Sequence, residues 1–158
     1  MSKYEERKIG KKAWLFRECQ PNSWNFILDK SKVYSIESVV EPKDCNDYCY
    51  HYVVKAEDGS IEEVREFMVL VCPETDNGKD EMYNLEKYID DNEVYADEVY
   101  KDGLFIAVHC EWGDWKHTHA WLRSLMQYIG YVEVSEKVTE DNGSDCYSAT
   151  HYFIKRQS

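Results

Sequence analysis

The stretch GDWKHTH at residues 113–119 concentrates side chains that carry acid–base or metal chemistry. It holds a carboxylate and two of the five histidines in the chain, and a His-Cys pair comes shortly before it. Imidazoles and thiolates are the usual ligands of zinc, and imidazole is the commonest general base. A metal-binding or hydrolase-type site here would draw on His109, Cys110, Asp114, His117 and His151.

The secondary structure expected around these residues would hold their side chains apart, which disfavours such a site. Local signals predict a helix over 115–129, with Asp114 as its N-cap and Gly130 as its terminator. Residues two apart on a helix point about 200° apart, so His117 and His119 diverge. His109 and Cys110 are neighbours on the preceding strand, so their side chains point to opposite faces of it. The pattern therefore favours a structural strand-to-helix junction, and the metal or hydrolase site stays the alternative.

A second group, CNDYCYH at 45–51, places Cys49 and His51 on one face of an expected strand, with Cys45 in the loop before it. A structural zinc site needs four ligands, usually in two close pairs, and the chain has no CxxC. Small buried cysteines explain the group as well. No P-loop, GxGxxG or GxSxG motif is present, so we assign no catalytic residue and expect no cofactor.

The net charge of −12 is unevenly spread. Residues 1–32 carry eight Lys/Arg against four Asp/Glu, whereas residues 33–103 carry six against twenty. Such an acidic surface repels phosphate backbones, so we do not expect direct nucleic-acid binding, including the single-stranded mode that stacked tyrosines would serve.

Between Glu74 and Asp102 lie eleven carboxylates and three lysines, interleaved with four tyrosines. Tyrosines supply contact area and carboxylates steer a basic partner, although a plain solvated face is the simpler alternative. We expect a small acidic accessory or regulatory protein that binds a macromolecule with a basic surface, with nucleic-acid mimicry as one version. The expected contact residues are Tyr83, Tyr88, Asp90, Asp91, Glu93, Tyr95, Asp97 and Glu98.

The order of the expected elements predicts an α+β fold, with a mostly antiparallel β-sheet packed against two helices. Asp58–Gly59 between two β-rich runs predicts a hairpin, and residues 92–103 fit either a helical continuation or an edge strand. The expected helices are 81–91 and 115–129, and the second lies in a C-terminal β-α-β-β unit. The expected strands are 13–19, 24–29, 32–40, 48–57, 60–71, 104–110, 131–138 and 146–155.

The organisation expected from the sequence is a single domain over 12–158 after a flexible basic tail at 1–11, with a loop between halves at 73–80. No signal peptide or membrane-length apolar run is present, so we expect a cytoplasmic protein without membrane contact. Its six cysteines are then reduced thiols.

Overall fold

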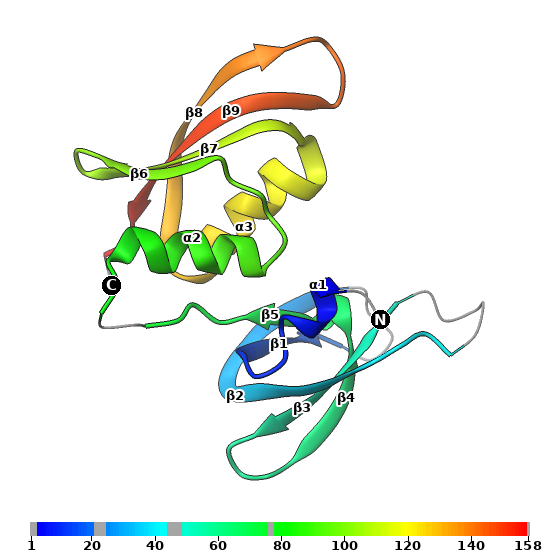
Figure 1. The fold of residues 1–158 in the computed structure, drawn as a ribbon. Helices are drawn as coiled ribbons and strands as arrows, with labels where there is room; N and C mark the ends of the chain where they lie inside the picture. The colour runs from blue at the N-terminus through cyan, green and yellow to red at the C-terminus, as the bar shows by residue number, and fades with distance from the viewer. Residues whose placement is uncertain (1–2, 21–24, 44–48, 76–77, 158) are drawn as a thin grey trace. The chain divides into compact units, whose positions relative to one another are not determined.

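The chain forms two compact units in a computed structural model, which describes residues 3–20, 25–43, 49–75 and 78–157. The N-terminal unit is Met1–Cys72 and the C-terminal unit is Pro73–Ser158 (Figure 1). Each unit contains its own antiparallel sheet, where the sequence predicted one sheet for the whole chain. The division falls at the start of the loop expected at 73–80, because the last strand of the first sheet ends just before it.

The N-terminal unit is a five-stranded sheet in the order β4-β3-β2-β1-β5. Its strands are β1 (Lys12–Glu18), β2 (Phe26–Val40), β3 (His51–Ala56), β4 (Ile61–Arg65) and β5 (Val69–Val71). Residues of the central strands alternate between buried and exposed, as expected for a sheet with one apolar face. The core is formed by Ala13, Leu15, Tyr34, Ile36, Tyr52, Val54, Ala56, Val69 and Val71.

Strand β2 is continuous over Phe26–Val40, where the sequence predicted two strands at 24–29 and 32–40 separated by the polar residues Lys30 and Ser31. The pairing with β1 shifts at this place: Ala13 pairs with Tyr34, but Leu15 pairs with Asp29. Residues 30–33 therefore bulge out of the β1 ladder without ending the strand. The polar residues at this place belong to an irregularity within one strand. Because bulges and turns are both rich in polar residues, composition alone did not distinguish them.

The expected strand 60–71 is split into β4 and β5 by a short 3-10 turn, η1 (Glu66–Met68). β4 forms the predicted hairpin with β3, and Gly59 supplies the positive φ of 89° that the turn requires. β5 instead pairs with β1 at the opposite edge of the sheet. One straight strand cannot occupy both edges, so the turn at η1 lets the chain cross.

The basic start is more ordered than the expected tail. Residues Lys3–Glu6 form the short helix α1, and Lys8 is only 7% exposed. The Lys8 ammonium lies 5.8 Å from the centre of the Tyr52 ring, within the range of a cation–π contact. Part of the positive charge near the N-terminus is thus held against the core.

The C-terminal unit is a four-stranded sheet in the order β6-β7-β9-β8, accompanied by two helices. Its elements are α2 (Glu81–Asp91), β6 (Glu98–Asp102), β7 (Phe105–Asp114), η2 (Trp115–Ala120), α3 (Trp121–Tyr128), β8 (Tyr131–Asp141) and β9 (Cys146–Lys155). The ambiguous segment 92–103 contributes the edge strand β6. The predicted fold class, α+β with mostly antiparallel strands and two helices, is confirmed.

Both helices turn an apolar face inward, α2 with Leu85 and Ile89 and α3 with Leu122 and Leu125. The hydroxyl of Tyr88 donates to the Leu125 carbonyl at 2.7 Å, which ties the helices together. The predicted helix at 115–129 begins as the π-helical turn η2 before it becomes regular in α3. Within the described part of the chain, no helix has the length and apolar character needed to cross a membrane.

Candidate functional site

The eight residues predicted to contact a partner divide into an exposed set and a buried pair. Tyr88 and Asp91 are 1% and 5% exposed, which corrects the expectation that they face a partner. Tyr88 lies on the inward side of α2, where its hydroxyl reaches the Leu125 carbonyl, and Asp91 is the last residue of the helix. The exposed residues are Tyr83, Asp90, Glu93, Tyr95, Asp97 and Glu98.

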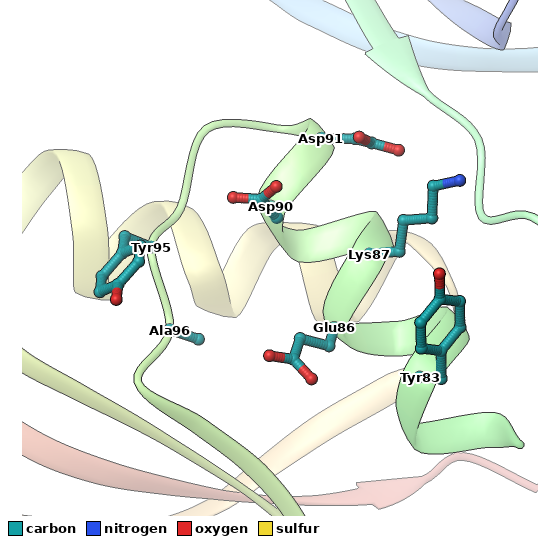
Figure 2. Close-up of a pocket in the computed structure, with 7 residues that line it drawn as sticks. All are labelled: Tyr83, Glu86, Lys87, Asp90, Asp91, Tyr95 and Ala96. Atoms are coloured by element: carbon teal, nitrogen blue, oxygen red, sulfur yellow. The ribbon is translucent and has the colours of Figure 1, made fainter.

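Four of these eight residues line one groove of about 380 Å³ beside α2, here named the acidic groove. Figure 2 shows Tyr83 and Tyr95 toward its two ends, with the Glu86 and Asp90 carboxylates between them. Tyr95 is 76% exposed and Tyr83 is 48% exposed. The lining residues are Tyr83, Glu86, Lys87, Asp90, Asp91, Tyr95 and Ala96.

Lysines around the acidic groove show how its surface handles positive charge. The Lys79 ammonium lies 5.1 Å from the centre of the Tyr83 ring, so this ring already accepts a cation on its face. Lys87 lines the groove, but its ammonium pairs with Glu74 at 2.8 Å. Glu86 and Asp90 contribute two further carboxylates to the lining of the groove.

The other predicted contacts lie outside the groove. The Asp97 carboxylate accepts a hydrogen bond from the Glu111 amide at 2.7 Å, so it fixes β7 locally. Glu98 pairs with His109 in the β6–β7 ladder. Glu93 has a φ of 70° just after α2, which suits a helix end more than a recognition surface.

The structure does not bring together the predicted metal residues His109, Cys110, His117 and His151. His109 Nδ1 lies 2.9 Å from the Thr150 hydroxyl, and His117 is exposed at the start of η2. Cys110 is fully buried, and burial raises the pKa of its thiol to about 12, which disfavours the thiolate that would bind a metal. Asp114 is the predicted N-cap and accepts from the His117 amide at 3.0 Å.

In the second predicted group only His51 lies on a strand, as the first residue of β3, whereas Cys49 lies in the loop before it. The expected pairing of Cys49 and His51 on one strand face was therefore wrong, and Cys45 lies outside the described residues. His51 lies near an acid, with 3.8 Å between its Nδ1 and the Glu63 carboxylate. The group offers no further described ligand for a metal.

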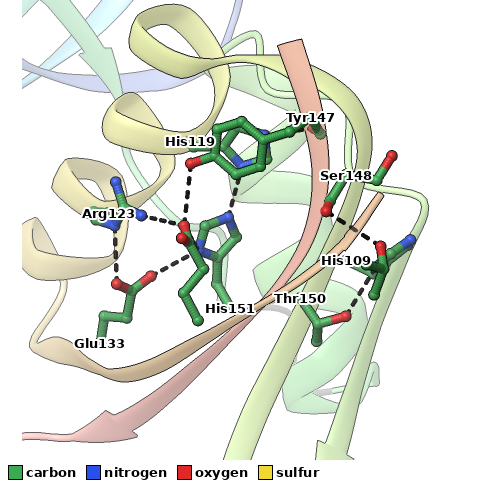
Figure 3. Close-up of polar contacts among 10 residues, drawn as sticks. His109, His119, Arg123, Glu133, Tyr147, Ser148, Thr150 and His151 are labelled. Carbon is green, nitrogen blue, oxygen red and sulfur yellow. Dashed lines mark hydrogen bonds and ion pairs between the residues drawn. The ribbon is translucent and has the colours of Figure 1, made fainter. Parts of the chain in front are cut away.

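A partly buried polar cluster that the sequence did not predict lies between η2, α3, β8 and β9 of the C-terminal unit (Figure 3). We name it the histidine cluster: His119, Arg123, Glu133, Glu136, Tyr147 and His151. His119 Nδ1 lies 2.7 Å from His151 Nε2, and His151 Nδ1 lies 2.7 Å from Glu133. Arg123 binds Glu133 at 2.9 Å and also Glu136.

Close backbone packing positions His119. A Cβ on Gly113 would lie 2.5 Å from the Thr118 methyl and 3.0 Å from His119 Nε2, so only glycine lets η2 approach β7 this closely. The His119 ring stacks on Tyr147 with 4.0 Å between ring centres, and its Nε2 faces the Tyr147 carbonyl at 3.0 Å. The glycine of GDWKHTH thus serves a close approach, whereas the neighbouring Trp112 has the positive φ of 49°.

The cluster fixes its charges through hydrogen bonds. Burial on its own would raise the pKa of Glu133, but hydrogen bonds from His151 and Arg123 outweigh burial and hold this pKa below its usual range. Burial lowers the pKa of His119. Of the described residues, His119, Glu136 and His151 form a set of ligand atoms within 4.8 Å of one another that could hold a metal.

Comparison with known proteins adds no relative: no family model, no curated protein and no solved structure matches the chain. The fold and the two candidate sites therefore rest on the residues themselves.

Proposed function

We propose that the protein is a small acidic accessory or regulatory protein that binds a basic segment of a partner protein in the acidic groove. The observation that carries the proposal is a concave surface in which carboxylates lie between two exposed tyrosines. Its described cysteines are free thiols, which fits the reducing cytoplasm expected from the sequence.

The chemistry of the groove fits lysine and arginine side chains. A guanidinium or ammonium group would pair with Glu86 or Asp90 and stack its stem on Tyr83 or Tyr95. Such aromatic anchors dominate binding energy in many interfaces, while exposed carboxylates mainly raise the association rate. The contact between Lys79 and Tyr83 is an internal example of this recognition.

Nucleic-acid mimicry is the more specific version of the proposal. In this version the partner's basic surface is one that binds DNA, and the carboxylates of the groove take the place of phosphates. Its separate test is competition, since duplex DNA and this protein would then exclude each other from the partner.

The test uses the full chain, labelled with ¹⁵N, and a synthetic peptide of repeated Lys-Gly-Arg units. We expect amide shifts to change between residues 83 and 96, and binding to weaken at least roughly tenfold in Glu86→Lys/Asp90→Lys. Tyr95→Ser should weaken binding without any change of charge.

A matched control separates the groove from general attraction between opposite charges. Glu57→Lys/Glu140→Lys changes the net charge by the same amount at two exposed acids outside the groove. We expect this control to bind the peptide nearly as well as the original chain. Equal weakening in both double variants, or amide shifts spread over the whole surface, would rule out the groove as the binding site.

A further inference from the structure

Two histidine rings meet edge to edge inside the C-terminal unit. His119 Nδ1 and His151 Nε2 are 2.7 Å apart, and both side chains have no solvent exposure (Figure 3). Their contact takes no part in the acidic groove. The protonation of these two facing nitrogens can be worked out from the hydrogen-bond partners of the second nitrogen on each ring.

Each outer nitrogen faces a group that only accepts hydrogen bonds. His119 Nε2 lies 3.0 Å from the Tyr147 carbonyl oxygen, and His151 Nδ1 lies 2.7 Å from a Glu133 carboxylate oxygen. Both outer nitrogens must therefore carry a hydrogen. A neutral imidazole has one N–H, so the two inner nitrogens then present lone pairs to each other, and a cation must lie between them.

The charges of the histidine cluster also call for a cation at the histidine pair. Glu133 and Glu136 on β8 supply two carboxylates, and Arg123 on α3 supplies one guanidinium that contacts both. Tyr147 on β9 adds only a neutral hydroxyl, 3.2 Å from Glu136. One positive charge is missing, and a proton or a metal ion at the histidine pair would supply it.

The surroundings are those of metal-binding histidines. Such histidines almost always donate their second N–H to a carboxylate or a backbone carbonyl, which fixes the tautomer and aims the lone pair at the metal. His151 does so with Glu133 and His119 with Tyr147. Glu136 lies beside the pair: its carboxylate contacts His151, and one ligand atom of each of His119, Glu136 and His151 lies within 4.8 Å of the others.

We propose that the C-terminal unit binds one transition-metal ion of the zinc class through His119 Nδ1, His151 Nε2 and a carboxylate oxygen of Glu136. The ion displaces the proton that otherwise joins the two rings. Zinc–nitrogen bonds of about 2.0–2.1 Å in a tetrahedral site require the nitrogens to separate to roughly 3.3 Å, a small side-chain movement.

This site differs from the one that the sequence suggested, since it keeps only His151 from that set. Because neither ring is exposed, the metal has a structural role, and its binding adds to the stability of the folded unit.

The experiment titrates chelator-treated full-length protein with Zn²⁺ by calorimetry, and with Co²⁺ by visible absorption. We expect one ion per chain, proton release on binding, and weaker binding as the pH falls. Glu136→Gln should weaken binding more than about 100-fold, and Glu133→Gln, which only orients His151, by about 10–100-fold. His109→Gln and His117→Gln are the controls, and binding should be unchanged in both.

A measurement without any variant guards against loss of folding. In ¹⁵N-histidine spectra of the original chain, Zn²⁺ should move the Nδ1 signal of His119 and the Nε2 signal of His151. No binding, or binding that persists unchanged in Glu136→Gln, would overturn the proposal and leave a proton between the rings.

Discussion

Each unit contains a cluster built around an arginine, and the two clusters balance their charges differently. In the N-terminal unit Arg17 binds both oxygens of Glu62 at 2.8 Å, and the Tyr34 hydroxyl completes the group. One cation meets one anion there, at side chains 41% and 34% exposed. In the C-terminal unit Arg123, which is 34% exposed, meets two carboxylates that are 20% and 24% exposed.

The difference shows what an unequal count of charges does inside a protein. The Arg17 cluster is complete by itself and needs nothing further. The histidine cluster has one anion in excess, and its lower exposure reduces the screening of that charge by water. A cation on the histidine pair, as proposed above, would balance this excess.

The largest predicted effect comes from removing the guanidinium of each cluster. Arg123→Gln removes the guanidinium that contacts both carboxylates and leaves them only their contacts with His151 and Tyr147. It should lower the free energy of unfolding by about 2–3 kcal/mol, since half-broken partly buried pairs are costly. Arg17→Gln should lower it by less than about 1 kcal/mol because its pair is exposed.

The measurement is urea unfolding of chelator-treated protein at pH 7, followed through amide signals of each unit separately. Equal losses in the two variants would show that the clusters do not differ in the way described.

A second prediction concerns the close packing that only the histidine cluster requires. Gly113→Ala places a methyl against Thr118 and His119, and should lower the free energy of unfolding of the C-terminal unit by about 1–3 kcal/mol. It should also separate the two histidine rings and weaken Zn²⁺ binding.

Gly143→Ala is the control for backbone strain. Gly143 has a φ of 82° but open space around its Cβ position, so this variant should leave Zn²⁺ binding intact. Thermal melts and Zn²⁺ titrations of Gly113→Ala and Gly143→Ala test whether a methyl group at position 113 displaces His119. Similar metal affinities in the two variants would contradict this steric argument.

The smallest predicted effect is the acid response of the Arg17 cluster. The hydrogen bond from Arg17 lowers the pKa of Glu62 below its usual value, despite the opposing effect of burial. A lowered carboxyl pKa stabilises the folded state above the unfolded value of about 4.3, and this contribution is lost as the pH falls through the folded-state pKa. Because the side chain is about one third exposed, the contribution should stay below about 1 kcal/mol.

Glu62→Gln should therefore reduce the stability of the N-terminal unit above about pH 5, and the difference from the original chain should shrink below roughly pH 4. Urea midpoints measured across this range test the sign. A difference that grows as the pH falls would contradict it.

The fold was largely predictable where local signals decide the structure. Helix α2 was expected at 81–91 and occupies Glu81–Asp91, and β9 was expected at 146–155 and occupies Cys146–Lys155. The N-cap at Asp114 was also predictable from a local signal. The 3-10 turn at Glu66–Met68 had no such signal, because it depends on the two sheet edges that the chain connects.

The histidine cluster could not be predicted for a related reason. Periodicity separated His117 from His119 correctly, but the partner of His119 is 32 residues away on β9. Their meeting depends on the register of β9 and on the π-helical turn η2, neither of which has a local signal. Glu133 and Glu136 join through a shift in the β8–β9 pairing at residues 133–135, which places both acids toward His151.

The three-residue strand β5 has a consequence for how the N-terminal unit folds during synthesis. Val71 pairs with Ala13, so the last strand of the unit pairs with the first, and contacts so distant along the chain form late. Until then β1 is an open edge with Leu15 unpaired on that side, and open apolar edges invite pairing between molecules. A chain cut before Val69 would keep that edge permanently, so a few residues at the end of the unit protect it from aggregation.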